Sequence, residues 1–174
     1  MKEFFEVLEH RRSIRAYQNR PLEPGQLDRI LQAAQRAPSA GNLQAYEIVV
    51  VQDAATLHDL ARLCYNQMFI AQAAAGLVFC ADPARSANRY GPKGETLYAV
   101  QDATLAAAYA ELAVAALGLA TCWIGAFDEV ELARRLKLRA ELRPVALLPI
   151  GWPAEDPPRT PRRPAQEVVH VYRP

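Results

Sequence analysis

The feature that most constrains the fold is an alanine-rich run, Tyr98–Leu117, which is followed by Gly118. Alanine has the highest helix propensity and glycine commonly follows the last turn of a helix, so this run predicts one long helix. Small residues occupy several of its faces, which allows neighbouring elements to approach closely. The longer apolar stretch Ala106–Ile124 contains Glu111, and we interpret it as a buried helix followed by a strand rather than as a membrane span.

Hydrophobic periodicity predicts the remaining elements. Further helices are expected from Phe4 into Arg11, between Pro24 and Pro38, and over Leu57–Leu63 and Glu129–Leu138. Strands are expected over Tyr46–Val51, which should be buried, Gly76–Cys80, Thr121–Ile124 and Val145–Ile150, with an edge strand at Val168, Val169 and Val171. Because helices outnumber strands and βαβ alternation is absent, we expect an α+β fold, one domain over 1–174 with helices around a mixed β-sheet. Five prolines between Pro153 and Pro164 predict an extended C-terminal tail.

The composition argues against several classes of function. A 51% hydrophobic chain with a formal charge of +1 is typical of a globular protein without a nucleic-acid or membrane partner. The three cysteines lie far apart in apolar stretches, which predicts packing residues and no metal site. Acidic residues near the N-terminus argue against a signal peptide, so we expect a cytoplasmic protein. Because GxGxxG, Walker, HExxH and GxSxG motifs are absent, we expect a cofactor to carry the chemistry.

A basic cluster, Arg11-Arg12-Ser13-Ile14-Arg15, lies at the end of the first predicted helix. Guanidinium groups bind phosphate through paired N–H donors, and a hydroxyl or a backbone N–H can complete such a site. The cluster therefore suits a phosphomonoester. The alternative is a solvated basic helix end, which the helix macrodipole also favours.

Two further clusters lie far from the first in sequence. Pro38–Gln44 combines small residues, which let the backbone approach a flat ring, with amides that reach its polar edge. Its alternative interpretation is an ordinary turn after a helix. Arg159–Pro164 places more cations in the tail, which a compact fold can return to the first cluster, although a solubilising tail is the simpler interpretation.

Five motifs occur in a fixed order: RRSIRAY, APSAGNLQAYEIVVV, GLATCWIGAF, LPIGWPAE and a tail with RRP. Together they span almost the whole chain, and their order and spacing resemble the nitroreductase family of FMN enzymes. The resemblance implies a homodimer with FMN bound at the subunit interface. It also implies NAD(P)H as the electron donor and a nitroaromatic, a quinone or another flavin as the acceptor, in a ping-pong cycle.

The resemblance implies a role for individual residues but identifies no catalytic side chain. Arg11, Arg12, Ser13 and Arg15 correspond to residues around the FMN phosphate and ribityl chain, with Arg162 closing on the same phosphate. Those that reach the flavin of the opposite subunit are Pro38, Ser39, Ala40 and Asn42. Asn66 resembles a position that touches the ring system, and Ile124 and Gly125 a backbone strip near its far side.

The sequence departs from the family pattern at three places. Ala45-Tyr46 stands where many members have Pro-Trp, and Phe69 and Thr160 stand where some have lysine. A lysine beside the pyrimidine end would stabilise the negative charge of reduced flavin, so Phe69 bears on the reduction potential.

Two alternative functions remain open. A specialised relative, such as a reductive dehalogenase or a flavin-fragmenting enzyme, would differ in the polar segment 82–94. This segment has turn residues at Gly91-Pro92 and Gly94, and a solvated loop is its simpler interpretation. A non-redox phosphate- or nucleic-acid-binding module would use the arginines alone, but the near-neutral charge argues against it.

Overall fold

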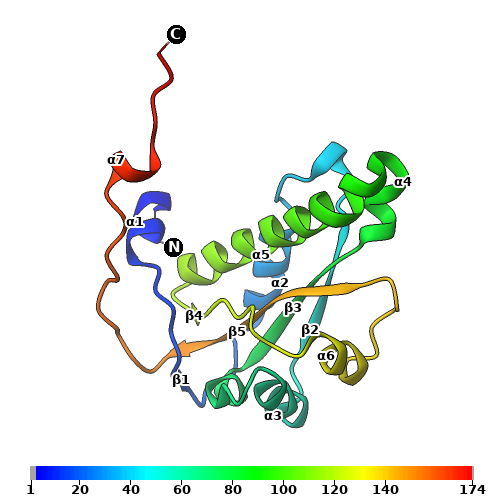
Figure 1. Cartoon of the computed structure of the whole chain (residues 1–174). Coiled ribbons are helices and arrows are strands. Elements are labelled where there is room, and N and C mark those ends of the chain that lie inside the picture. Colours follow the sequence, from blue (N-terminus) through cyan, green and yellow to red (C-terminus); the bar gives the residue numbers. More distant parts are fainter. Residues whose placement is uncertain (1–2, 174) are drawn as a thin grey trace.

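The structure, a computed structural model, describes residues 3–173, and these form an antiparallel sheet covered by helices (Figure 1). Its strands are β1 (Tyr17–Gln18), β2 (Tyr46–Val51), β3 (Ala75–Ala81), β4 (Ala120–Thr121) and β5 (Arg143–Pro153). Their order is β1-β5-β3-β2, and β4 also pairs with β5. The α+β class predicted from the sequence is confirmed. The predicted mixed sheet is not found, because all pairings between these strands are antiparallel. The one parallel contact described is an isolated bridge between Ser13 and Thr121. Residues 1, 2 and 174 of the predicted domain lie outside the description.

The α-helices are α1 (Phe4–His10), α2 (Gln26–Ala34), α3 (Ala54–Leu63), α4 (Pro83–Lys93), α5 (Ala99–Ala116), α6 (Glu129–Arg135) and α7 (Ala165–Val168). Short 3-10 turns occur at Ala40–Asn42 and Met68–Gln72, and a π-turn, Gly94–Tyr98, joins α4 to α5. Three helices begin at an aspartate whose carboxylate accepts a backbone N–H of the first turn: Asp53, Asp82 and Asp128.

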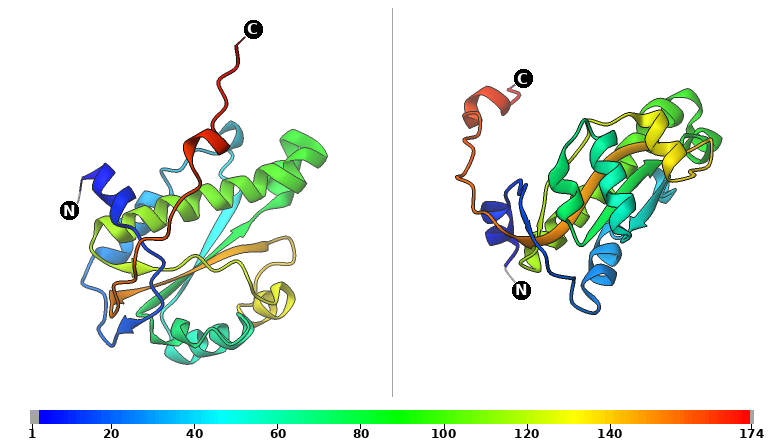
Figure 2. Two further views of the ribbon diagram at one scale, coloured as in Figure 1. Left: turned by 60° about the vertical axis from the view of Figure 1, so that its left-hand side comes forward. Right: turned by 90° about the horizontal axis from the view of Figure 1, so that it is seen from below.

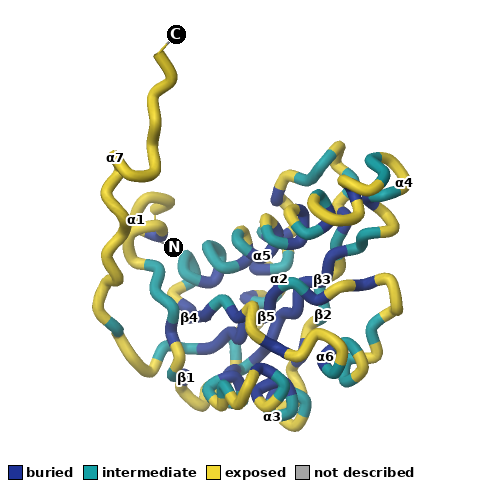
Figure 3. The backbone as a smooth tube through the Cα atoms, in the orientation of Figure 1, coloured by how far each residue is buried: buried dark blue, intermediate teal, exposed yellow. Residues whose placement is uncertain are grey.

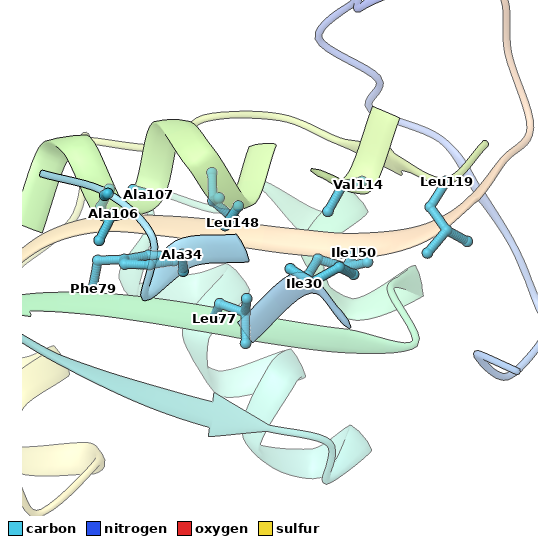
Figure 4. Packing of buried hydrophobic residues seen from close by; sticks show 13 residues of the cluster. Ile30, Ala34, Leu77, Phe79, Ala106, Ala107, Val114, Leu119, Leu148 and Ile150 are labelled. Carbon is cyan, nitrogen blue, oxygen red and sulfur yellow. The ribbon is translucent and has the colours of Figure 1, made fainter. Parts of the chain in front are cut away.

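The central strands are buried on both faces because helices cover both. In β3, Leu77 and Phe79 pack with α2 and α5, whereas Val78 and Cys80 pack with α3 and α6. Figure 4 shows the first of these layers. This alternation follows from the two-residue period of a strand, and it explains why β3 and β5 are almost continuously apolar.

The long helix α5 confirms the prediction from the alanine-rich run. Its alanines pack directly on the sheet, and Ala106, Ala107 and Ala110 are fully buried. Gly118 follows the helix with φ of 73°, the left-handed conformation that glycine adopts most easily. On another side of α5, Leu105 and Tyr109 are exposed, so the helix carries apolar surface that the described chain leaves uncovered. Within residues 3–173, no helix has both the length and the apolar character to cross a membrane.

The prediction of a buried strand over Tyr46–Val51 is only partly right. β2 lies at the edge of the sheet, where Glu47 and Val50 are exposed and Val51 alone is buried. The β-branched run gives the strand, but it does not distinguish an edge from a centre. The predicted strand Thr121–Ile124 is likewise shortened, because only Ala120–Thr121 is a strand and Ile124 forms an isolated bridge with Leu147.

Two predictions are wrong: a solvated loop over 82–94, although its turn at Gly91 is present, and an edge strand at Val168, Val169 and Val171. Segment 82–94 is mainly the helix α4, which begins with Asp82 as its cap and Pro83 in its first turn and bends at Gly91, where φ is 56°. In the tail, no edge strand forms at Val168, Val169 and Val171; Ala165–Val168 is a short helix, and these valines are exposed (Figure 3). The extended tail itself is confirmed, and Figure 2 shows it leaving β5 and standing away from the sheet. Because no neighbouring strand meets the valines, nothing in the described chain fixes them as β-structure.

Candidate functional site

The two basic clusters, Arg11–Arg15 and Arg159–Pro164, come together around one cavity. It has a volume of about 250 Å³ and lies between the end of α1 and the returning tail. Five arginines line it with the hydroxyl residues Ser13 and Thr160: Arg11, Arg12, Arg15, Arg159 and Arg162. Glu9 is the one acidic residue among the lining residues. The tail therefore returns cations to the first cluster, as the sequence suggested.

The arginines of the first cluster are held in different ways. Arg11 is half-buried and its Nη1 donates to Oε1 of Glu111, on α5, at 3.0 Å. Arg12 Nη1 donates to the carbonyl oxygens of Glu9 at 2.6 Å and Arg11 at 3.0 Å. Arg15 is exposed, and its backbone N–H donates to the Glu155 carboxylate. Arg11 therefore ties α1 to α5, while the Arg15 side chain forms no ion pair within residues 3–173.

Backbone contacts fix the position of Ser13. Ser13 forms the parallel bridge with Thr121, and the Ile14 N–H donates to the Thr121 carbonyl at 3.0 Å. The Tyr17 hydroxyl donates to the Ile14 carbonyl at 2.8 Å, and burial raises the pKa of that phenol. Beside Ser13, burial raises the pKa of the Cys122 thiol, although Arg15 and a hydrogen bond with Ser13 partly oppose this.

The donors of this cavity fit a phosphate group. Guanidinium and hydroxyl donors from two chain segments converge on it, which is the arrangement that a phosphomonoester requires. The Nε of Arg12 is buried without a hydrogen-bond partner. A buried N–H without a partner costs free energy, and a bound anion would remove that cost.

The second cluster forms a tight loop at the start of β2. Gly41, Asn42 and Gln44 have φ values of 55°, 58° and 50°, in the left-handed region. The Gln44 N–H donates to the Ser39 hydroxyl at 3.0 Å. A groove of about 490 Å³ lies between residues 38–40 and the first turns of α5. The loop thus has a defined shape, and Asn42 is exposed on it.

The structure does not bring the loop and the basic clusters together within one chain. The loop contacts α5 at Asp102, whereas Arg11 contacts α5 at Glu111. These positions are nine residues apart, which is about 14 Å along a helix that rises 1.5 Å per residue. Figure 1 shows α1 and the tail near the last turns of α5, and α4 and the loop near its first turns.

The remaining predicted residues lie around the other face of the sheet. Asn66 is exposed and has φ of 63° directly after Tyr65, whose φ is 55°. The side chain of Ile124 is buried, and its backbone N–H and carbonyl both pair with Leu147, at 3.0 and 2.9 Å. Gly125 is exposed, so of this pair it has the more accessible backbone.

Phe69, which stands where some relatives carry lysine, is half-buried. Its ring lies 6.5 Å from the Tyr17 ring, centre to centre, and packs on the cluster that contains Ile14. The chain thus places an apolar contact beneath the Ser13–Tyr17 segment. Among residues 3–173 there is no group of three or more His, Cys, Asp or Glu side chains that could hold a metal ion.

Helix α4 packs against the loop. Arg85 Nε donates to the Leu43 carbonyl at 2.6 Å, and Arg89 Nη1 donates to the Gly41 carbonyl at 3.3 Å. A Cβ at Gly41 would lie 2.3 Å from the Tyr90 hydroxyl oxygen, so glycine is needed there for this approach.

Sequence reasoning missed two acidic residues of α5, Asp102 and Glu111. Asp102 accepts two backbone N–H groups of the loop, and Glu111 pairs with Arg11. Each is an isolated carboxylate in an alanine-rich helix, and this isolation is the sequence signal that could have indicated a specific contact. Their partners were not predictable, because they lie 57 to 100 residues away in sequence.

Comparison with known proteins places this geometry in a family. The chain is 35% identical to the FMN reductase [NAD(P)H] of Bacillus subtilis, over 98% of this chain and 74% of the relative. It is 34% identical to the oxygen-insensitive NADPH nitroreductase of Salmonella typhimurium, with the same shares covered.

Solved structures agree with this assignment. NfrA2 of B. megaterium matches with a TM-score of 0.89 and 33% identity, over 99% of this chain and 76% of that one. The NADPH:FMN oxidoreductase of Vibrio harveyi, solved as a complex with NAD+, also has a TM-score of 0.89, with 30% identity over 98% of this chain and 77% of that one. The sequence model of the nitroreductase family matches residues 8–152. This chain therefore belongs to the nitroreductase family.

Proposed function

We propose that this protein is an FMN-dependent oxidoreductase that passes electrons from NAD(P)H to a small acceptor. The observation that carries the proposal is the cavity in which five arginines from the segment after α1 and from the tail converge. The relatives support it by their names, which include an FMN reductase and a nitroreductase that use NAD(P)H or NADPH. We further propose that residues 1–174 form one FMN-binding domain, and that the protein is cytoplasmic.

Arg12, Ser13, Arg15 and Arg162 would hold the phosphate, with Arg11 supporting them through its ion pair with Glu111. When bound, FMN supplies a ring that accepts hydride and releases electrons to an acceptor. The protein's part is to fix the cofactor, leave one ring face open and keep donors at its polar edge. Asn66, Ile124 and Gly125 are the residues that we assign to the ring from the chain that supplies the arginines.

We propose that the active unit is a homodimer. Within one chain, the loop residues Pro38, Ser39, Ala40 and Asn42 lie about 14 Å along α5 from the contact of Arg11, by the helical rise. A symmetric partner would bring its own loop to the other chain's arginines. The exposed side chains of Leu105 and Tyr109 on α5 offer an apolar surface for that partner. The extended tail would pack along the surface of the partner.

We propose that donor and acceptor occupy the same open site in turn, which gives ping-pong kinetics. The acceptor would be a nitroaromatic, a quinone or another flavin. A specialised activity, such as reductive dehalogenation or flavin fragmentation, is the second candidate, because α4 packs on the loop that we assign to the flavin. A phosphate-binding module without redox chemistry is the third candidate. It would use the arginine cavity alone and would require no contact from the loop Pro38–Gln44.

Purification tests the proposal directly. Yellow protein that releases about one FMN per chain, and whose flavin absorbance NADH or NADPH bleaches in stopped flow, is the expected result. A panel of quinones, nitroaromatics and free flavins should then restore the absorbance. Colourless protein that FMN does not reconstitute would contradict the proposal and favour the phosphate-binding module. Bound FMN that neither nicotinamide reduces would favour a specialised activity.

A further inference from the structure

The most unusual polar group outside the basic cavity is Asp102. It is 2% exposed and lies on the sheet-facing side of α5, between the buried alanines Ala99 and Ala103. No cation within residues 3–173 forms an ion pair with it. A buried carboxylate without a cation is costly unless hydrogen bonds compensate it, so its contacts define what it does.

Both oxygens of Asp102 accept backbone N–H groups from the loop before β2. Oδ1 accepts from Ala40 at 2.9 Å, and Oδ2 accepts from Ala45 at 3.2 Å. The two donors bracket the loop, because one lies near its beginning and the other at its end. Ala45 is fully buried, so its N–H has no access to water as a replacement partner.

The loop between these two contacts is strained and closely packed. Asn42 and Gln44 hold left-handed backbone conformations, which asparagine tolerates but which cost free energy for a residue such as Gln44. From the other side, Arg85 and Arg89 of α4 donate to its carbonyl oxygens. The loop is therefore clamped between α5 and α4, and the carboxylate is the charged member of the α5 side.

We propose that Asp102 is a positioning residue for flavin, which acts by holding Ser39–Asn42 in the conformation that meets the ring. The proposal rests on the function proposed above, because it requires that this loop contact flavin. A carboxylate is needed in this geometry because both of its oxygens must accept. In asparagine, the amide nitrogen would face one of the two N–H groups, so one hydrogen bond would become a contact between two donors.

The test compares Asp102→Asn with Asp128→Asn in the purified, FMN-loaded protein. Asp128 is a matched control, because its carboxylate also accepts a backbone N–H, from Glu131, but it caps α6 on the other layer. Hydrogen exchange over residues 39–45 should become at least tenfold faster in Asp102→Asn and stay unchanged in the control. The visible circular dichroism of bound FMN should also change in Asp102→Asn alone.

Flavin affinity separates positioning of the ring from a general loss of structure. Asp102→Asn should weaken FMN and riboflavin by the same factor, about tenfold, because the lost contacts belong to the ring and leave the phosphate contacts intact. If Asp102→Asn does not fold, Asp102→Glu takes its place, since it keeps both acceptors but displaces them by one methylene. The same equal weakening of FMN and riboflavin is then expected.

The outcomes distinguish this proposal from the function on which it rests. A wild-type protein that binds no FMN overturns both. A wild-type protein that binds FMN, together with an Asp102→Asn variant whose affinities and circular dichroism match the wild type, overturns the positioning role alone. Faster exchange of the loop without any change in flavin affinity or spectrum also overturns it, because the clamp would then serve the fold only.

Discussion

At the scale of single residues, the basic cavity shows that neighbouring arginines have unequal roles. Arg11 is tied to Glu111 and Arg12 to backbone carbonyl oxygens, whereas Arg15 and Arg162 form no ion pair with the described part of the chain. Side chains without a protein partner are the ones that a ligand can engage at little cost. We therefore expect the binding energy for a phosphate to depend most on these last two residues.

Arg162→Ala should weaken FMN binding while leaving riboflavin binding almost unchanged. A charge-assisted contact contributes about 1.5 to 3 kcal/mol, which corresponds to a roughly 10- to 150-fold rise in Kd. Arg163→Ala is the matched control, because Arg163 is adjacent in sequence but pairs with Glu167. Fluorescence titration of the apoprotein with each flavin measures the effect. Equal losses in the two variants, or equal affinities of the wild type for FMN and riboflavin, would contradict the phosphate site.

Stability should fall at alkaline pH because of the buried thiols. Burial raises the pKa of the Cys64 thiol to about 12 from its ordinary value of 9.0. The neutral thiol is thus favoured in the folded state, so its contribution is complete below about pH 9 and is lost progressively toward pH 12. The slope approaches about 1.4 kcal/mol per pH unit for each such thiol. Urea unfolding between pH 8 and 11 measures it, and Cys64→Ala should show a shallower fall; an identical slope would exclude this thiol.

At the scale of elements, the sequence predicts the helices and strands whose signals lie within their own residues. It misses features that depend on contacts with segments distant in sequence. The alanine run and Gly118 predict α5, and the apolar runs predict β3 and β5, because these signals lie within the elements. The edge position of β2 and the helix in 165–168 depend on what lies beside them in space. In segment 82–94 the signal is local: Asp82 followed by Pro83 indicates the start of a helix. The glycines of the same segment favour turns, and they led to the wrong prediction of a loop.

The same distinction applies to the candidate site. Residue type suggested that the two basic clusters could bind phosphate, with a solvated helix end and a solubilising tail as the alternatives, and the tail does bring Arg162 to the cavity. The Asp102 and Glu111 contacts could not be predicted, because each joins segments whose approach only the folded sheet creates. Residue chemistry thus indicated candidate donors, and the fold determines which of them already have protein partners.

Gly94→Ala should disrupt the junction between α4 and the π-turn. A Cβ there would lie 2.5 Å from the backbone carbonyl oxygen of Ser86, and a backbone atom cannot move aside cheaply. We expect a loss of about 1 to 3 kcal/mol in the free energy of unfolding, as for other overpacked sites. Gly125→Ala is the control, because its Cβ would meet only Trp123 Nε1, at 3.5 Å. Chemical denaturation of the apoproteins compares them, and equal stabilities would show that α4 moves freely.

At the scale of the whole molecule, α5 separates the arginine cavity from the loop that we assign to the flavin. It holds the arginine cavity near its last turns and the Asp102-clamped loop near its first turns. A rigid helix fixed to the central sheet keeps this separation constant, so no small movement within one chain closes it. Symmetric pairing of two chains is the simplest way to complete both sites at once.

Mixed dimers test this arrangement. One chain carries Arg15→Ala with Arg162→Ala, which leaves the Arg11–Glu111 ion pair intact, and the other carries Ser39→Ala with Asn42→Ala. If each site takes its arginines from one chain and its loop from the other, a heterodimer has one site with both defects and one with neither. Purified heterodimers, selected with two different affinity tags, should therefore bind one FMN per dimer at wild-type affinity, whereas each mutant homodimer binds weakly at both sites. If instead each site is built within one chain, both heterodimer sites carry a defect, and no site recovers wild-type affinity. Full FMN affinity in a wild-type protein diluted to monomers would reject the composite site by an independent route.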